Sequence, residues 1–437
     1  HPSPSRQECP TTITTTTFTF LLTLLLTLHL HAQDCPTMNI PCKTVWLKGY
    51  VDEGIPGPEH FDIRSSIVSF GLSSVSLEDL PDGAIVVQAH SLSVDPYLRG
   101  RIKRKNPLNQ KSAKGGTDVA IDTDTGETIM AGFVAGQVIA SRNSAWAVDD
   151  FIGGAMDFST VQILAPARLN ATIVWKLTGY VDASNISLGI GALGMPGATA
   201  YGGLCDVLRP KKSAAVGGEA TQSPETLFVS SAAGAVGSLV GQIAKSVYGS
   251  VVIGSCGGPV KNERIVARYG FDHAIDYTTL SGEDGGKAEL DERLKAVAPN
   301  GIDMYFEAVG GIHFEAAMTA LRPHGRIAVC GVISKYNDAE LSFNKIDIGS
   351  MIYSFQRIEG FVASPWLRRQ RGDFLRDMSQ WIQEKKEIPD ETFFEGIEQW
   401  PLAFQSLFVR GNASKSGKVV VRIARPSLDE KKETKSE

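Results

Sequence analysis

The chain has 437 residues, which is enough for two domains of ordinary size, each with its own core. Its hydrophobic content of 43% and charged content of 21% are typical of a soluble globular protein, and its net charge of −5 gives no indication of nucleic-acid binding. The six cysteines are spread along the chain without Cys-x-x-Cys spacing, which argues against a disulfide framework or a structural zinc lobe.

Residues 1–37 differ in composition from the rest of the chain. Their apolar segment, Phe18 to Leu30, is too short to span a bilayer comfortably. The first methionine is Met38, and we interpret it as the functional start of a cytoplasmic protein, with residues 1–37 as an extension outside the fold. The alternative is secretion, because the segment resembles a signal-peptide core with Ala32 as a cleavage point. In that case the glycosylation triplets would matter; they begin at Asn170, Asn185 and Asn412.

Short strands and glycine turns fill the chain from Lys43 to Leu177. Apolar and β-branched runs predict strands at residues 44–47, 84–89, 133–140 and 161–164. There is no long amphipathic helix, so we expect a β-rich, barrel-like domain. The polar stretch between Arg101 and Glu127 predicts a surface loop.

Strands and helices alternate after a transition at residues 182–208, where Pro196 begins a predicted helix over Met195–Tyr201. Strands are predicted at residues 226–231, 251–253, 273–277, 302–306, 326–329 and 358–362, and helices at residues 236–247, 260–269, 288–297, 314–321 and 366–386. This alternation implies an α/β fold with a parallel sheet covered by helices on both faces. A last strand at residues 419–423 is assigned to the first domain, and residues 426–437 form a charged tail that we expect to be disordered.

The stretch from Thr226 to Val247 carries the strongest functional signal. A short apolar strand runs into small residues from Ala232 to Gly237, and a helical apolar pattern follows. A strand that turns into a helix in this way leaves N–H groups at the helix start open to a pyrophosphate. The alternative is a tight turn in some other α/β protein.

The residues after the next strand indicate which dinucleotide binds. That strand ends at Ile253–Cys256 without the carboxylate that would hold the ribose hydroxyls of NAD, and Lys261 and Arg264 follow it. Basic residues without an acidic neighbour favour a 2′-phosphate, so we predict NADPH rather than NADH. The alternative is that both bases belong to a solvated helix face. Steady-state kinetics with the two cofactors separate these possibilities.

Five motifs resemble those of one family, the zinc-independent medium-chain dehydrogenase/reductases, and within it the NADPH-dependent alkenal/one oxidoreductases and plant double-bond reductases. They are Val94-Asp-Pro-Tyr-Leu-Arg-Gly-Arg101, Gly194-Met-Pro-Gly-Ala-Thr-Ala-Tyr201, Ala233-Gly-Ala-Val-Gly237, Tyr305-Phe-Glu-Ala-Val-Gly-Gly311 and Cys330-Gly-Val-Ile-Ser-Lys-Tyr-Asn337. The resemblance implies a Rossmann doubly wound parallel sheet plus a GroES-like β-barrel domain, with the active site between them. It implies a barrel domain at residues 38–179 that residues 364–425 complete, a Rossmann domain at residues 180–363, and a homodimer.

The resemblance also implies roles for individual residues. The pyrophosphate would lie on Gly234, Ala235, Val236 and Gly237, and the 2′-phosphate on Lys261 and Tyr277. The nicotinamide half would lie along the loop of Cys330, Gly331, Val332, Ile333, Ser334 and Tyr336, flanked by Phe361 and Val362, with Asn412 as a further contact. The substrate would face Tyr97 and Tyr353.

This chain departs from the family pattern in three places. Glu307-Ala308 stands where the family has an asparagine, so that contact to the cofactor is in doubt. The C-terminal Gly-x-Asn-x-Gly-Lys motif is loosened over residues 411–418. The loops at residues 101–127 and 211–224 are longer than usual, and the first borders the expected substrate entrance.

The residue types favour reduction of a conjugated double bond. The barrel half contains Cys42, His60 and His90 but no set of ligands typical of a catalytic zinc. Without a metal, hydride addition to the β-carbon of an enal or enone requires only donors for the developing enolate, and Tyr97 and Tyr353 are the candidates. The alternative is that both tyrosines only pack, and Cys330 is interpreted as a small core residue rather than a nucleophile.

Two other functions stay open at this point. A quinone reductase would use the same cofactor and cleft, and a nucleotide-binding protein without turnover would keep only the cofactor site. An NADPH-oxidation screen against enals, enones and quinones separates the three.

Overall fold

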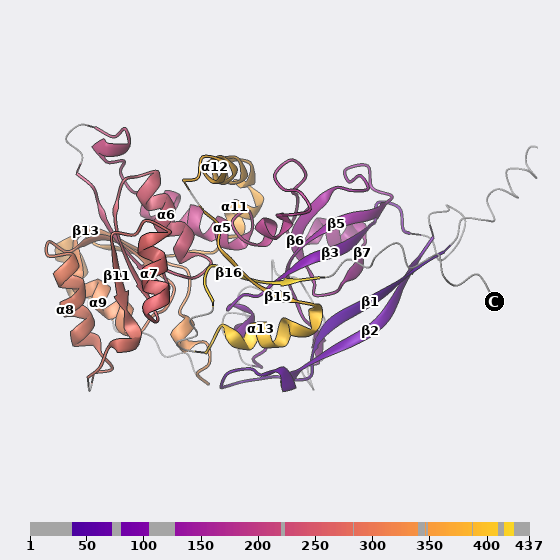
Figure 1. Ribbon diagram of the computed structural model, residues 1–437, viewed down its shortest axis with the longest axis horizontal. Helices are drawn as coiled ribbons and strands as arrows, with labels where there is room; N and C mark the ends of the chain where they lie inside the picture. The colour runs from indigo at the N-terminus through magenta and orange to yellow at the C-terminus, as the bar shows by residue number, and fades with distance from the viewer. Residues whose placement is uncertain are drawn as a thin grey trace, which may run out of the picture.

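A six-stranded parallel sheet forms one half of the protein, and antiparallel sheets form the other half (Figure 1). The computed structural model describes residues 37–71, 80–104, 127–219, 223–282, 284–339, 346, 348–386, 388–409 and 415–423. The predicted extension up to residue 36, most of the predicted loop at 101–127, Asn412 and the predicted tail lie outside these residues. In the part of the chain that is described, no helix is long and apolar enough to cross a membrane.

The parallel sheet has the strand order β11-β10-β9-β12-β13-β14, which is the order of a doubly wound dinucleotide-binding fold. Its strands in chain order are β9 (Thr226–Ser230), β10 (Val251–Cys256), β11 (His273–Asp276), β12 (Ile302–Glu307), β13 (Leu321–Val329) and β14 (Arg357–Gly360). The order reverses between the adjacent strands β9 and β12, so a crevice is expected outside their carboxyl ends. The predicted Rossmann sheet is confirmed.

Helices cover both faces of this sheet, as the alternating pattern predicted. They are α6 (Gly237–Ser246), α7 (Pro259–Ala267), α8 (Lys287–Val297) and α9 (Ile312–Ala320). On one face, α8 and α9 bury Leu290, Leu294 and Phe314 against Phe228 and Tyr305 of the sheet. The central strands β9, β10 and β12 are buried almost throughout, which explains why they are apolar without alternation.

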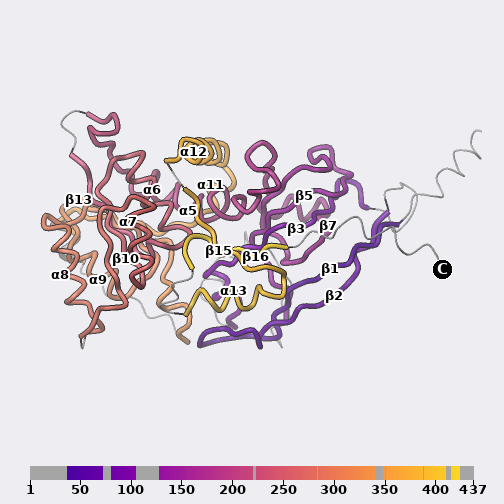
Figure 2. Tube along the Cα trace, viewed as in Figure 1, coloured from indigo at the N-terminus to yellow at the C-terminus, as the bar shows by residue number. Residues whose placement is uncertain are grey.

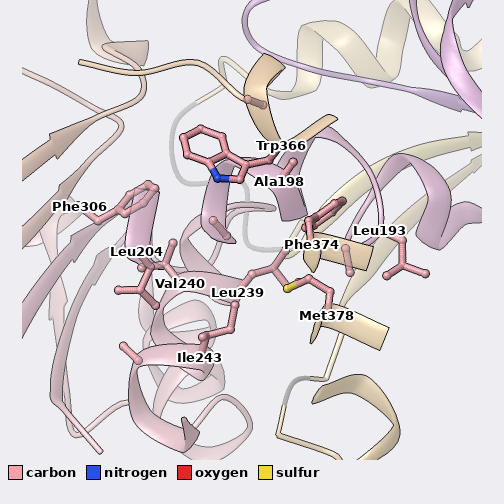
Figure 3. Close-up of a cluster of buried hydrophobic side chains, with 14 of the residues drawn as sticks. Leu193, Ala198, Leu204, Leu239, Val240, Ile243, Phe306, Trp366, Phe374 and Met378 are labelled. Carbon is pink, nitrogen blue, oxygen red and sulfur yellow. The ribbon is translucent and has the colours of Figure 1, made fainter. Parts of the chain in front are cut away.

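The opposite face is covered by α6 and by segments from elsewhere in the chain (Figure 3). Leu239, Val240 and Ile243 of α6 lie in one buried cluster with residues of α5 (Met195–Tyr201), α11 (Ser364–Arg368) and α12 (Arg371–Gln383). The predicted single helix at residues 366–386 is therefore wrong in one respect, because it consists of α11 and α12. The break lies at Gln370, whose φ of −102° and ψ of 17° leave the helical region.

The largest sheet of the other half has the order β15-β16-β3-β5-β6-β8, with β7 paired to β3, and all its pairs are antiparallel except β15 with β16. Its strands are β3 (Ile85–Ser93), β5 (Ala131–Ser141), β6 (Phe151–Asp157), β7 (Val161–Leu164), β8 (Val174–Lys176), β15 (Glu391–Glu395) and β16 (Lys418–Arg422). The predicted return of the last strand is confirmed, since β16 pairs with β3. Strands β15 and β16 and helix α13 (Trp400–Ser406) lie between the two halves of the molecule (Figure 1).

A hairpin of β1 (Met38–Leu47) and β2 (Phe61–Phe70) extends beside the barrel, away from the parallel sheet (Figure 2). The strands pair over ten residues, and β1 also pairs with β4 (Thr128–Ile129). The barrel core stacks Trp400 on Phe404 beside Phe61 and Phe158. The remaining short helices are α2 (Leu98–Arg101), α4 (Pro166–Ala171) and α10 (Ile348–Ser354).

Candidate active site between the two sheets

The glycine turn lies at the carboxyl end of β9, in the centre of the parallel sheet. Ser231 leaves the strand with a φ of +54°, and α6 begins at Gly237. A Cβ atom on Gly237 would lie 2.5 Å from the carbonyl oxygen of Ser231, so a side chain there would push the helix away from the strand. The first N–H groups of a helix have no partner within it, and here Gly234, Ala235 and Val236 precede them without a large side chain. This geometry suits a pyrophosphate.

The barrel half reaches this turn through the residues before β16. The N–H of Gly417 donates to the carbonyl oxygen of Ala233 at 2.8 Å, and Gly417 forms an isolated parallel bridge with Gly234. A Cβ atom on Gly417 would lie 1.9 Å from the carbonyl oxygen of Asp390, and its φ is +64°. The C-terminal segment is therefore held tightly against the glycine turn.

A buried ion pair links this segment to the loop that carries Tyr97. The ammonium of Lys418 donates to the carboxylate of Asp95 at 3.1 Å and to the carbonyl oxygen of Val94 at 2.7 Å. The two side chains are 4% and 3% exposed. Burial lowers the pKa of Lys418, and the adjacent Asp95 opposes that shift. The sequence analysis did not identify this role of Lys418.

Tyr97 lies at the junction of the two halves. It stands directly before α2 and packs against both the cluster around α6 and the barrel core. The guanidinium of Arg101 lies 5.2 Å from the centre of its ring. Burial raises the pKa of Tyr97, with Arg101 opposing the rise, so the phenol stays protonated and can donate a hydrogen bond near neutral pH.

The loop from Cys330 to Tyr336 crosses from the parallel sheet to the barrel. Ile333 N–H donates to the carbonyl oxygen of Ala308 at 3.1 Å, and Ser334 N–H donates to that of Val309 at 3.1 Å. Ile333 and Tyr336 pack against the barrel core, and the hydroxyl of Tyr336 accepts from Val332 N–H at 3.4 Å. The predicted cofactor loop therefore spans the same junction as Tyr97.

Other residues of the expected nicotinamide site differ in their exposure. Burial raises the pKa of the Cys330 thiol to about 12, so it stays protonated and fits the interpretation as a packing residue. Phe361 lies edge-on to Phe306 and Trp366, with ring centres 6.0 and 5.9 Å away. Val362 is 67% exposed.

Arg99 joins the nicotinamide loop to the barrel. Its buried guanidinium donates to the side-chain oxygen of Asn337 at 3.0 Å, to the carbonyl oxygen of Val51 at 2.6 Å and to that of Gly54 at 3.1 Å. Lys103 also donates to the carbonyl oxygen of Asp338. The segment from Tyr97 to Lys103, which includes α2, thus carries Tyr97 and also anchors the end of the nicotinamide loop at Asn337 and Asp338.

Glu307 and Ala308 stand where the family has an asparagine. Glu307 is fully buried, and its carboxylate accepts from the Ser230 hydroxyl at 3.1 Å and from Gly310 N–H at 2.9 Å. Burial raises the pKa of Glu307. Ala308 N–H donates to the hydroxyl of Ser230 at 3.0 Å. The carboxylate of Glu307 therefore accepts hydrogen bonds from Ser230 and Gly310 at the end of β12. Ala308 has no side-chain donor for a cofactor.

Lys261 and Tyr277 lie at the carboxyl end of β10, where the second phosphate was expected. A Cβ atom on Gly257 would lie 2.9 Å from the hydroxyl of Tyr277, so that ring covers the residue after the strand. Lys261 is half-buried on α7, and burial lowers its pKa.

Arg264, which was also predicted to hold the second phosphate, is paired with a carboxylate in this structure. Its guanidinium donates to Asp390 at 2.8 Å, and the same carboxylate accepts from the Ser416 hydroxyl at 2.7 Å and from the Tyr269 hydroxyl. Arg268 also lies 3.6 Å from Asp390. Arg264 is therefore linked to the C-terminal segment through Asp390, and its contact with the 2′-phosphate stays a prediction.

Tyr353, the other predicted donor, differs from Tyr97 in its surroundings, and its role stays a prediction. It lies on α10 with 86% of its surface exposed, and it is not part of the buried clusters that the described residues form. The structure brings Tyr97 and Tyr336 to the junction of the two halves but leaves Tyr353 on the outer surface.

No three His, Cys, Asp or Glu side chains gather closely enough to hold a metal ion within the described ranges.

Two family models match the chain. One, described as the N-terminal domain of oxidoreductase, covers residues 58–172, and the other, described as zinc-binding dehydrogenase, covers residues 235–372.

Similar proteins are known from several organisms. Prostaglandin reductase 1 of Bos taurus is 34% identical over 82% of this chain and 96% of its own length. The NADP+-dependent 2-alkenal reductase of Nicotiana tabacum is 31% identical over 88% of this chain and 98% of its own length. The crystal structure of CurA from Vibrio vulnificus in complex with NADPH matches with a TM-score of 0.68 and 29% identity, over 88% of this chain and all of that chain.

Proposed function

This chain belongs to the zinc-independent medium-chain dehydrogenase/reductases that use NADPH, and from that premise we propose that it reduces the carbon–carbon double bond of α,β-unsaturated aldehydes or ketones. The observation that carries this proposal is the junction of the two halves, where Tyr97 and the Cys330–Tyr336 loop pack against both buried clusters and Gly417 forms a bridge with the glycine turn at Gly234. Relatives named as prostaglandin and 2-alkenal reductases support the substrate class.

The residues present fit NADPH. Gly237 allows a pyrophosphate to approach the start of α6 closely, and Lys261 and Tyr277 lie beyond the end of β10. The loop of residues 330–336 connects the parallel sheet to the barrel core. When bound, NADPH supplies a hydride to the β-carbon of the substrate. Negative charge then develops on the carbonyl oxygen of the substrate, and a hydrogen bond from a neutral phenol stabilises it. A proton added to the α-carbon of this enolate completes the reduction. We assign that donor to Tyr97.

Replacing Tyr97 by phenylalanine should lower kcat tenfold or more, which corresponds to about 1.4 kcal/mol, because the enolate loses a donor. The Kd for NADPH should stay unchanged. Stopped-flow oxidation of NADPH with a 2-enal measures kcat, and fluorescence titration measures Kd. Tyr180→Phe, at an exposed tyrosine after β8, is the matched control.

Tyr353→Phe tests the expectation that came from the sequence. Because Tyr353 is exposed, its replacement should change kcat less than twofold, on the order of 0.4 kcal/mol or less. A tenfold loss with Tyr353→Phe and none with Tyr97→Phe would reverse the assignment. A quinone reductase, the other enzyme considered, would oxidise NADPH with quinones but not with enals.

We also propose a homodimer that forms along β14. This strand ends the parallel sheet, and edge strands carry backbone groups that can pair with a second chain. Around it lie exposed apolar side chains, namely Ile346, Ile348, Ile352 and Phe355. Light scattering should give twice the chain mass for the native protein and a monomer for Ile352→Asp. A monomeric native protein at micromolar concentration would contradict this proposal.

A cytoplasmic location is proposed on the state of the cysteines. Cys42, Cys205, Cys256 and Cys330 are free thiols among the described residues, which fits a reducing compartment. Mass spectrometry of the native N-terminus tests this proposal, and a mature end near Gln33 with attached glycans would support secretion instead.

A further inference from the structure

A second lysine interacts electrostatically with Lys261, and it comes from the barrel half of the molecule. Lys415 precedes β16 and is only 8% exposed. The two residues after it are firmly held: Ser416 N–H donates to the hydroxyl of Thr392 at 3.2 Å, and Gly417 N–H donates to Ala233 at 2.8 Å on the glycine turn. The position of Lys415 is thus set by the backbone that crosses the turn.

The carboxylate of Asp390 joins the segment that contains Lys415 to α7, the helix that contains Lys261. It binds the hydroxyl of Ser416, next to Lys415, and the guanidinium of Arg264, which lies one helical turn after Lys261 on α7. These contacts hold the backbone at Lys415 next to α7, and the charge of Lys261 acts on Lys415 across this contact. Asp390 itself is already balanced by Arg264 and Arg268.

The lysine pair lacks an acidic partner. None of the ion pairs found among the described residues includes Lys261 or Lys415. Burial and the nearby charge of Lys261 lower the pKa of Lys415 to about 8. The Cys256 thiol beside Lys261 has its pKa raised to about 12 by burial and stays neutral. Two cations that lie together in a partly buried place without an anion are destabilising, and a bound dianion would remove that cost.

We propose that Lys415 is a second cationic ligand of the 2′-phosphate of NADPH and that it makes this chain select NADPH over NADH. The proposal rests on the proposed function, because it assigns a residue to the cofactor site. The end of β10 is the place at which a dinucleotide fold recognises the adenosine ribose, and the pyrophosphate belongs at the glycine turn. Lys261, with which Lys415 is paired, stands after β10.

The variant Lys415→Gln tests the proposal. We expect the Kd for NADPH to rise about tenfold or more, the range of a charge-assisted hydrogen bond, and the Kd for NADH to stay within twofold. Calorimetry with the fragments 2′,5′-ADP and 5′-AMP should show the same contrast, and it requires no turnover. Lys415→Arg should retain most of the preference for the phosphorylated ligands.

Lys295→Gln provides the matched control, because Lys295 is an exposed lysine on α8 and the charge change is the same. It should leave both affinities unchanged. The melting temperature of Lys415→Gln should not fall, since an unpaired buried charge is removed, and this separates a lost contact from a misfolded protein.

Three results would overturn the inference. An unchanged NADPH affinity would remove Lys415 from the site, and an equal loss for NADPH and NADH would assign it to the pyrophosphate. A fall in melting temperature with loss of all binding would make Lys415 a structural residue. If the native protein bound neither NADPH nor 2′,5′-ADP, the proposed function would fail as well, whereas the three results above concern Lys415 alone.

Discussion

Lys418→Met should lower the free energy of unfolding by about 3 to 5 kcal/mol, the usual effect of leaving one member of a buried ion pair without its partner. The variant leaves the carboxylate of Asp95 buried at 3% exposure without its cation, and the carbonyl oxygen of Val94 loses a donor. Urea unfolding followed by fluorescence measures this change. Because Asp95 lies two residues before Tyr97, kcat should fall too.

Two comparisons isolate the ion pair. Asp95→Asn combined with Lys418→Met should recover part of the loss, because no charge then stays buried. Lys43→Met removes the same functional group from an exposed pair with Glu398, whose side chains are 52% and 51% exposed, and should cost at most about 1 kcal/mol. If Lys418→Met cost no more than Lys43→Met, the pair would not hold the Tyr97 loop.

Gly237→Val should weaken NADPH binding about 100-fold, or about 2.7 kcal/mol, because its side chain cannot fit between α6 and β9. The first added carbon would lie 2.5 Å from the Ser231 oxygen and 3.0 Å from the Ala232 Cα, and both are backbone atoms that cannot move aside cheaply. The helix start would shift away from the place of the pyrophosphate.

The control for this variant is Gly372→Ala on α12, where an added carbon meets nothing within 4 Å. It should leave binding unchanged and stabilise the protein slightly, by up to about 1 kcal/mol, because alanine favours a helix more than glycine does. NADPH titration by fluorescence and thermal unfolding measure both variants. Native-like affinity in Gly237→Val would mean that the glycine turn does not hold the cofactor.

The sequence predicted most of the parallel sheet because its central strands are short apolar runs. The helices between the strands have apolar residues at i, i+3 and i+4 spacing. The prediction was weaker in the barrel, where strands such as β2 (Phe61–Phe70) and β15 (Glu391–Glu395) are partly exposed and less apolar. The break between α11 and α12 depends on the backbone of Gln370, which a helical pattern does not reveal.

The site was predicted in outline, but the partners of its charged residues were not. Asp390 is 126 positions from Arg264, and Asp95 is 323 positions from Lys418, so only the folded chain shows that these charges neutralise each other. One signal for Lys415 was present in the sequence. Counted back from Gly417-Lys418, Lys415 rather than Asn412 stands at the third position of the Gly-x-Asn-x-Gly-Lys pattern.

The most direct test of the function follows the hydride itself. The protein is supplied with NADPH whose two C4 hydrogens are replaced by deuterium, together with a 2-enal, and the product is examined by NMR. We predict a saturated aldehyde with one deuterium on the β-carbon and none on the carbonyl carbon. An allylic alcohol with deuterium on the carbonyl carbon, or a product without deuterium, would contradict the proposed reaction.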